Sequence, residues 1–149
     1  MKAGIDFIGI TTPFFCHDGQ GNFILHKRSN QCRDERGFWD VGSGKLEFGQ
    51  TLEESVLREV KEEYGCIGII QNQLPPYTLL RTHEGVKTHW IAIPFLILVD
   101  PKKMKNNDPD KITEVGLFSL LKLPKPLHSG LRYILKRNAS YFKKYHKGG

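Results

Sequence analysis

Three glutamates, Glu59, Glu62 and Glu63, lie close together in the stretch LREVKEEYG and could act as a set. On a helix, which turns about 100° per residue, their carboxylates share one face within roughly 100° of arc. Like charges this close repel one another. Arg58 and Lys61 could relieve the repulsion on an ordinary solvated face. Alternatively, a hard divalent cation such as Mg²⁺, which prefers oxygen ligands and bridges to substrate phosphates, could bind there.

Glycines punctuate the segment just before these glutamates. Gly42, Gly44 and Gly49 surround Glu47 in the sequence VGSGKLEFGQ. A glycine-rich loop lets the backbone approach a helix N-terminus closely, and it would present Glu47 to the same cation. The flanking residues therefore favour the metal site over a solvated helix face.

The stretch from Gly44 to Cys66 resembles the Nudix box, GX5EX7REUXEEXGU, in which U is an aliphatic residue. The positions that agree are Gly44, Arg58, Glu59, Val60, Glu62, Glu63 and Gly65. Glu47 matches an acidic position that is common in the loop of the box. Gln50 stands where the family has Glu, and Cys66 takes the last aliphatic position. A glutamine oxygen binds a cation more weakly than a carboxylate does, but the principal ligands remain, so we expect activity to survive.

The resemblance implies an α/β fold, an α/β/α sandwich around a mixed β-sheet, formed by a single domain over residues 1–149. It also implies hydrolysis of a nucleoside diphosphate linked to another moiety, with Mg²⁺ or Mn²⁺ as the cofactor. The implied metal-binding residues are Glu59, Glu62, Glu63, Glu47 and Gly44. The implied catalytic residues are Glu59, Glu62 and Arg58. In these roles Glu59 or a nearby acid helps to activate water, and Arg58 orients the glutamates.

Cations for the substrate phosphates and a general base are expected outside the helix. Arg28 stands where many Nudix proteins have a phosphate-binding arginine, and Lys45 in the box loop is a second substrate-binding candidate. Glu114 is preferred over Asp110 as the general base, because a Glu followed closely by a Trp-Phe-like pair is usual in the family. Each of these residues could instead be an ordinary surface charge.

Aromatic residues near the box could contact the substrate. Trp39 is the candidate for stacking on a nucleobase, with Phe38 and Trp90 beside it, although each could equally fill the core. His128, in PLHSG, is similar to a late histidine of Nudix relatives that hydrolyse GDP-mannose. Those relatives have a modified box that this chain does not share. A nucleotide-sugar hydrolase therefore remains an alternative.

The surrounding sequence predicts strands and two helices that would position these residues. Runs rich in β-branched and aromatic residues predict strands at 4–16, 23–28, 77–83, 88–99 and 114–118, with a hairpin turn at EGVK. Thr51 and Glu54 form a capping-box pattern, and Gly65 ends the helix predicted over 51–64. Its sheet-facing residues would be Leu57, Val60 and Tyr64. Apolar residues at helical spacing predict the second helix, over 129–145.

Length and composition limit the class of protein. The chain has 149 residues, a formal net charge of +6 and three cysteines. These values indicate one soluble globular domain, and without a convincing secretory signal or membrane span we expect it in the cytoplasm. The odd number of cysteines without a Cys-x-x-Cys pair argues against a disulfide scaffold and a cysteine-rich zinc site. A basic surface attracts polyanions, including phosphorylated metabolites.

Functions of different classes remain open. The leading one is a pyrophosphohydrolase that converts a nucleoside triphosphate, or another nucleoside diphosphate-X, to a nucleoside monophosphate plus pyrophosphate or phosphorylated X. A Nudix-fold module that binds a nucleotide without efficient turnover is a rival, for which Gln50 is the hint. Binding of RNA or DNA through the basic C-terminal segment is a third, and the lack of a recognisable RNA-binding motif argues against nucleic acid as the partner. The sequence does not distinguish a monomer from a homodimer.

Overall fold

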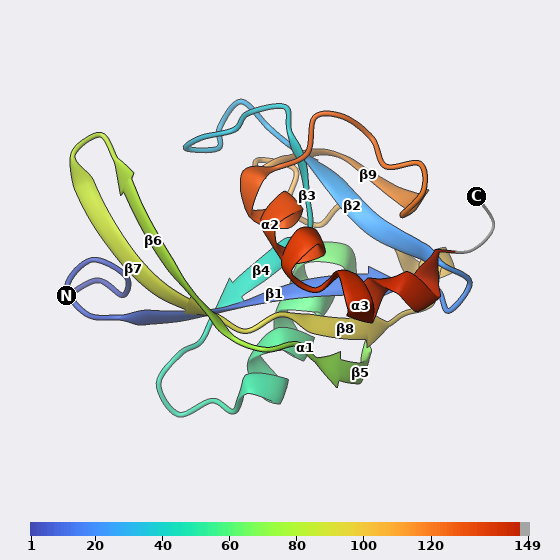
Figure 1. The fold of residues 1–149 in the computed structure, drawn as a ribbon, viewed down its shortest axis with the longest axis horizontal. Helices are drawn as coiled ribbons and strands as arrows, with labels where there is room; N and C mark the ends of the chain where they lie inside the picture. Colours follow the sequence, from blue (N-terminus) through green and yellow to red (C-terminus); the bar gives the residue numbers. More distant parts are fainter. Residues whose placement is uncertain (147–149) are drawn as a thin grey trace.

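A mixed nine-stranded β-sheet forms the centre of the computed structural model, which describes residues 1–146 (Figure 1). Its strands are β1 (Gly9–His17), β2 (Asn22–Arg28), β3 (Trp39–Asp40), β4 (Gly42–Lys45), β5 (Ile69–Gln73), β6 (Tyr77–His83), β7 (Val86–Ala92), β8 (Phe95–Leu98) and β9 (Ile112–Ser119). The helices are α1 (Leu52–Tyr64), α2 (Ser129–Arg137) and α3 (Ala139–Phe142), with 3₁₀ turns η1 (Pro101–Lys103) and η2 (Lys143–Tyr145). No helix in this described part of the chain has the length and apolarity that crossing a bilayer requires.

Strand β1 is the hub of the sheet. It runs parallel to β7 and β8 and antiparallel to β2 and β4. The sheet continues from β2 to β3 and β9, from β7 to β6, and from β8 to β5. The run predicted as a strand over 88–99 is thus divided between β7 and β8, because Pro94 between them has no backbone N–H to donate.

Helix α1 covers one face of the sheet, and its ends agree with the predicted capping pattern. The Thr51 hydroxyl accepts the Glu54 backbone N–H at 3.1 Å, and the Glu54 carboxylate accepts the Thr51 N–H at 3.3 Å. Gly65 ends the helix with a left-handed φ of 72°. The buried side chains are Ser55, Val56, Val60 and Tyr64. Leu57, predicted to pack on the sheet with Val60 and Tyr64, is partly buried and packs at the edge of this core, and Val56, which was not predicted, is fully buried in it.

The opposite face is covered by α2, α3 and η2, drawn in red in Figure 1. The helix predicted over 129–145 is interrupted at Asn138, whose backbone N–H and side-chain amide both donate to the Ile134 carbonyl, at 3.0 and 3.1 Å. An asparagine that competes in this way for a helix carbonyl disfavours continuation of the helix. The apolar side chains on this face are Leu131, Ile134, Phe142 and Tyr145, which pack with Phe15 and Phe23. Helices on both faces of a mixed sheet confirm the predicted α/β/α sandwich.

Other differences from the predicted elements lie at strand ends and at an edge. Residues 3–8 form a turn in which the Gly4 N–H donates to the Phe7 carbonyl at 2.7 Å, so the first strand begins at Gly9. The sequence pattern does not predict β5, because IIQNQ is an outer strand whose side chains are largely exposed. Strand β9 extends the predicted 114–118 by residues at both ends. The three cysteines are free and buried, as predicted.

Candidate active site

Gly42 and Gly44 allow α1 to lie directly against β4. A Cβ atom at Gly44 would lie 2.2 Å from Cγ of Glu59, and a Cβ at Gly42 would lie 3.2 Å from Oε1 of Glu63. The first distance is far below any real contact, so a side chain at Gly44 would push the helix or Glu59 away. The two glycines therefore bring the backbone of β4 next to two of the three clustered glutamates.

The clustered glutamates are not equivalent in burial. The side chains of Glu59 and Glu63 are 21% and 16% exposed, whereas that of Glu62 is 60% exposed. Arg58 contacts two of them: its Nη2 lies 3.2 Å from Oε1 of Glu59, and its Nε lies 3.6 Å from Oε1 of Glu62. Arg58 thus contacts both Glu59 and Glu62, and its role in orienting them for catalysis stays a prediction.

Glu63 lacks such a cation. Burial, followed by the neighbouring carboxylate of Glu59, raises the pKa of Glu63 to about 8. Among the described residues its one ion-pair contact is His26, whose Nδ1 lies 3.9 Å from Oε1. Burial lowers the pKa of His26 to about 3, and that ring, hydrogen-bonded to the Tyr64 hydroxyl at 2.5 Å, is neutral. A group of carboxylates in which Glu63 has no cationic partner among the described residues fits a hard divalent cation, which prefers oxygen ligands.

The loop between β4 and α1 carries Glu47, which lines a hollow beside residues 3–8 rather than the cavity that Glu63 lines. Glu47 is about half exposed and lies 3.8 Å from Nζ of Lys45. Its backbone N–H donates to the side-chain oxygen of Gln50 at 3.0 Å, while the Gln50 N–H donates to the Glu47 carbonyl at 3.1 Å. The Gly44 carbonyl accepts the Thr11 hydroxyl at 3.0 Å. Gln50 therefore braces the loop through its side-chain oxygen, which a glutamate also has.

Cationic side chains and Glu63 line one cavity of about 210 Å³, here called the Glu63 cavity. Its cations are Arg28, Arg33 and Lys111. The Arg28 guanidinium is held by Asp34, with Nη2 2.9 Å from Oδ1. The structure thus brings Arg28 to the same cavity as Glu63, and its role in binding phosphate stays a prediction.

A second cavity of about 390 Å³, here called the Trp90 cavity, lies on the α2 side of β4. Because side chains alternate along a strand, Ser43 and Lys45 face away from α1, and both line this cavity. Asp40 and Ser43 line both cavities, so the two adjoin. Burial raises the pKa of Asp40 to about 7. Lys45 therefore lines the Trp90 cavity, whereas Arg28, the other predicted substrate-binding cation, lines the Glu63 cavity.

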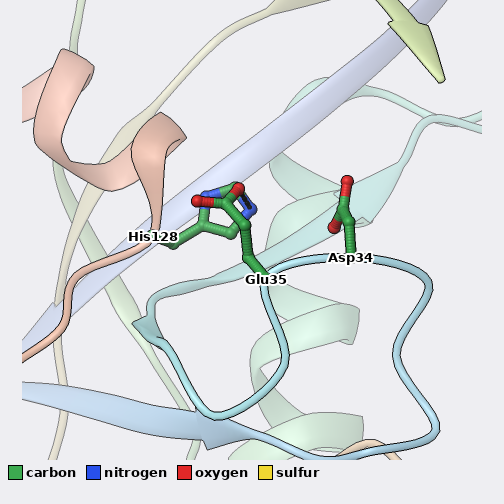
Figure 2. A group of neighbouring side chains, drawn as sticks. All are labelled: Asp34, Glu35 and His128. Atoms are coloured by element: carbon green, nitrogen blue, oxygen red, sulfur yellow. Dashed lines mark ion pairs between the residues drawn. The ribbon is translucent and has the colours of Figure 1, made fainter.

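A network of polar side chains ties the loop between β2 and β3 to the start of α2. The carboxylate of Glu35 accepts the backbone N–H and the hydroxyl of Ser129, both at 2.8 Å, and lies 2.8 Å from Nε2 of His128. Figure 2 shows Glu35 and His128 pointing toward each other, while Asp34 stands apart. Ligand atoms of Asp34, Glu35 and His128 lie within 4.8 Å of one another. The Asp34 carboxylate already pairs with Arg28. We therefore interpret the contacts of Glu35 with His128 and Ser129 as hydrogen bonds that hold the loop against α2, and not as a metal site.

His128 has a structural position at the start of α2. Its Nδ1 accepts the Gly130 N–H at 2.9 Å, so Nε2 carries the proton donated to Glu35. Burial lowers the pKa of His128 to about 4, although the Glu35 carboxylate opposes that shift, and the ring is neutral. His128 also lines the Trp90 cavity, so it is within reach of whatever binds there.

Glu114 and Trp39 line neither cavity. Lys27 is the cross-strand neighbour of Glu114, and Nζ of Lys27 lies 3.7 Å from its carboxylate. Since His26 faces α1, alternation along β2 and β9 puts Glu114 on the opposite side of the sheet. The Trp39 ring packs edge-on against Phe118, with centroids 5.1 Å apart. The structure therefore gives Glu114 and Trp39 surface and packing positions away from the glutamate cluster.

Other residues reach the site without a sequence signal. Asp108 is among the acids that raise the pKa of Glu63, and the next-door Asn107 N–H donates to the Glu63 carbonyl at 3.1 Å. Arg33 and Lys111 come from polar loops that carry no motif. The polar composition of these two loops was the clue that the sequence offered.

Residues 9–137 match the family model described as the NUDIX domain. An ADP-ribose pyrophosphatase of Methanocaldococcus jannaschii is 34% identical over 102 residues, which are 68% of this chain and 57% of that protein. The mouse 8-oxo-dGDP phosphatase NUDT18 is 33% identical over 125 residues, which are 80% of this chain and 35% of that protein. The chain thus spans only part of the length of these relatives.

Solved structures share the fold. A MutT NUDIX hydrolase from Burkholderia pseudomallei aligns with a TM-score of 0.71 and 23% identity, over 89% of this chain and 99% of that one. A MutT protein from Methanosarcina mazei aligns with a TM-score of 0.68 and 26% identity, over 94% of this chain and 96% of that one. Both alignments extend over nearly all the elements described above.

Proposed function

Because this chain belongs to the Nudix family, we propose that it is a metal-dependent pyrophosphohydrolase acting on a nucleoside diphosphate linked to a further group, a third phosphate included. The observation that carries the proposal is the Glu63 cavity, in which a buried carboxylate faces Arg28, Arg33 and Lys111. An enzyme that cleaves a phosphoanhydride needs carboxylates to bind a metal ion and basic side chains to bind the phosphates, close to each other.

The box residues would have distinct roles in this reaction. Glu59, Glu62 and Glu63 would hold Mg²⁺ or Mn²⁺, with Glu47 and the Gly44 carbonyl at the edge of the same site. When bound, the metal would lower the pKa of a coordinated water and neutralise phosphate oxygens. Glu59, oriented by the guanidinium of Arg58 at 3.2 Å, would accept the proton of the attacking water.

The cations would position the substrate for attack. Arg28, held by Asp34 and with Nη1 3.6 Å from Oδ2 of Asp40, would bind phosphate oxygens beside these carboxylates, and Arg33 and Lys111 would add positive charge. Glu114 has no role in this scheme because the sheet separates it from the glutamate cluster. Water activation therefore rests on acids of α1.

The substrate would be a nucleoside diphosphate derivative. The relatives described above are named for ADP-ribose and for 8-oxo-dGDP, which are both of this class. The adjoining Trp90 cavity has room for a nucleoside beside the phosphate groups. A nucleoside triphosphate would give a nucleoside monophosphate and pyrophosphate, and a nucleotide sugar such as GDP-mannose is the alternative that His128 suggests.

The test is a substrate panel with Mg²⁺ or Mn²⁺, followed by identification of the products. The panel contains the common nucleoside triphosphates, 8-oxo-dGDP, ADP-ribose and GDP-mannose. We expect turnover of at least one compound, with cleavage at a phosphoanhydride and loss of activity in EDTA. Tight nucleotide binding without turnover of any compound would contradict the proposal and favour a binding module.

A further inference from the structure

Trp90 stands where three hollows of the surface meet. It lines the Trp90 cavity, a hollow of about 710 Å³ beside the turn formed by residues 3–8, and a hollow of about 650 Å³ that Arg28 and Arg81 also line. The residue is only half-buried. Because Trp90 lines these hollows, part of its indole is accessible to a ligand, whereas Trp39 lines none of them and its ring packs against Phe118.

Two glycines hold this indole in place. A Cβ at Gly4 would lie 2.3 Å from Nε1 of Trp90, and a Cβ at Gly9 would lie 2.4 Å from Cζ3. The N-terminal turn, residues 3–8, is itself fastened to β7, since the His89 N–H donates to the Gly4 carbonyl at 2.8 Å. Gly9 is the cross-strand partner of Trp90. The indole thus lies against bare backbone, an arrangement in which an aromatic ring covers a glycine.

The rest of the Trp90 cavity suits a planar aromatic ligand. Leu79, the neighbour of Trp90 on β6, adds an apolar wall. Arg81 and Asp40 supply hydrogen-bonding groups in this cavity, and Asp40 also lines the adjoining Glu63 cavity. Flat apolar walls with a few convergent polar groups are typical of a site for a heterocycle.

We propose that Trp90 is the residue on which the nucleobase of the substrate stacks, and that Gly4 and Gly9 are positioning residues that hold the indole in the orientation for stacking. This inference rests on the proposed nucleotide substrate. It assigns to Gly4 and Gly9, which lie outside the box, a part in substrate affinity.

Fluorescence tests the stacking directly, because the chain has two tryptophans, Trp39 and Trp90. In the Trp39→Phe variant the emission comes from Trp90 alone. Titration with AMP, GMP or CMP without metal should quench this emission in a saturable way. In the Trp90→Phe variant, the same titrations should leave the emission of Trp39 unchanged. Equal responses of the two variants, or no response of Trp90 to any of the nucleotides, would overturn the proposal.

Kinetics with the best substrate of the panel test both the stacking on Trp90 and the positioning of its indole by Gly9. Base–aromatic stacking is worth about 1–3 kcal/mol, so Trp90→Leu should raise KM about 5- to 150-fold with little change in kcat. Trp90→Phe, which retains an aromatic face, should restore most of the affinity. Gly9→Ala should raise KM in the same way, because its Cβ displaces the indole.

Ile8→Ala is the matched control for the glycine variant, since Ile8 is an exposed neighbour of Gly9 and should keep the wild-type KM. Melting temperatures identify a Gly9 variant that fails to fold, in which case the Trp90→Leu and Trp90→Phe comparison decides. An active enzyme with unchanged KM in Trp90→Leu overturns this inference and leaves the proposed function intact. Quenching of Trp90 in a protein without turnover supports the stacking and contradicts the proposed function.

Discussion

At the scale of single residues, the site depends on two glycines as much as on its charged side chains. Gly44 has no Cβ where Glu59 passes, and Gly42 has none beside Glu63. The glutamates, Arg58 and Arg28 were identifiable from the sequence, because the spacing of charges on a helix and the box pattern are local. Trp90 was only one of several aromatic candidates, since its role depends on glycines more than 80 residues away in the chain.

Glu63→Gln is expected to lower kcat by about 100-fold or more, the scale of losing one charge-stabilising group in an active site. Its amide keeps the shape of the side chain but removes a negative charge from the proposed cation site. The measurement is steady-state hydrolysis of the best panel substrate at saturating Mg²⁺. Glu53→Gln, at an exposed position in the first turn of the same helix, is the control and should keep full activity. Near-normal kcat in Glu63→Gln would remove Glu63 from the mechanism.

Gly44→Ala is expected to destabilise the fold by about 1–3 kcal/mol, the usual cost of overpacking, and to lower kcat as well. The new methyl group would overlap Glu59 Cγ, which a Cβ would approach to 2.2 Å. Urea unfolding and kcat measure the two effects. Ser43→Ala, next in the strand but exposed, should change the free energy of unfolding by less than about 0.5 kcal/mol. Equal stability of the two variants would show that α1 does not depend on close contact with β4.

At the scale of elements, prediction succeeded where the signals are short-range. The capping box at Thr51 and the stop at Gly65 gave α1 its correct ends. The break at Asn138 was missed because the apolar spacing continues across it. The position of Glu114 depends on the β2–β9 register, which no local pattern encodes. Long-range pairing therefore decided which polar residues meet.

Thr51→Ala should lower the free energy of unfolding by about 1 kcal/mol, because it removes the acceptor of the Glu54 N–H at the start of α1. Thr51→Ser keeps the hydroxyl and should retain most of the stability. Urea unfolding compares the three proteins, and kcat of the folded variants should match the wild type. A serine variant as unstable as the alanine variant would show that the methyl group of Thr51, rather than its hydrogen bond, stabilises the helix end.

At the scale of the whole molecule, the two faces of the sheet carry different parts of the candidate site. α1 presents acids on one face of the sheet, while α2 and the β6–β7 hairpin enclose the Trp90 cavity on the other. The hairpin and the N-terminal turn lie side by side in Figure 1, as their hydrogen bond requires. The overall fold class followed from the box and the order of elements. The division of work between faces required the three-dimensional arrangement.

Mg²⁺ should raise the melting temperature of the protein by several degrees, since a ligand at about 100 times its Kd stabilises the folded state by roughly 2.7 kcal/mol. The cation would relieve the repulsion among the carboxylates around Glu63. The thermal shift should disappear in Glu63→Gln and persist in Glu53→Gln. An identical shift in all three proteins would mean that the stabilising Mg²⁺ binds elsewhere.

The four residues of strand β4 alternate between two faces of the sheet. Gly44 is constrained by Glu59 of α1 and Gly42 by Phe14 and Glu63, while Lys45 lines the Trp90 cavity and not the Glu63 cavity. A directed-evolution library confined to Lys45 and its neighbours across the Trp90 cavity could therefore explore new substrates while the contacts between β4 and the acids of α1 stay unchanged. Insertion of one residue into β4 would exchange the two faces and abolish both properties at once.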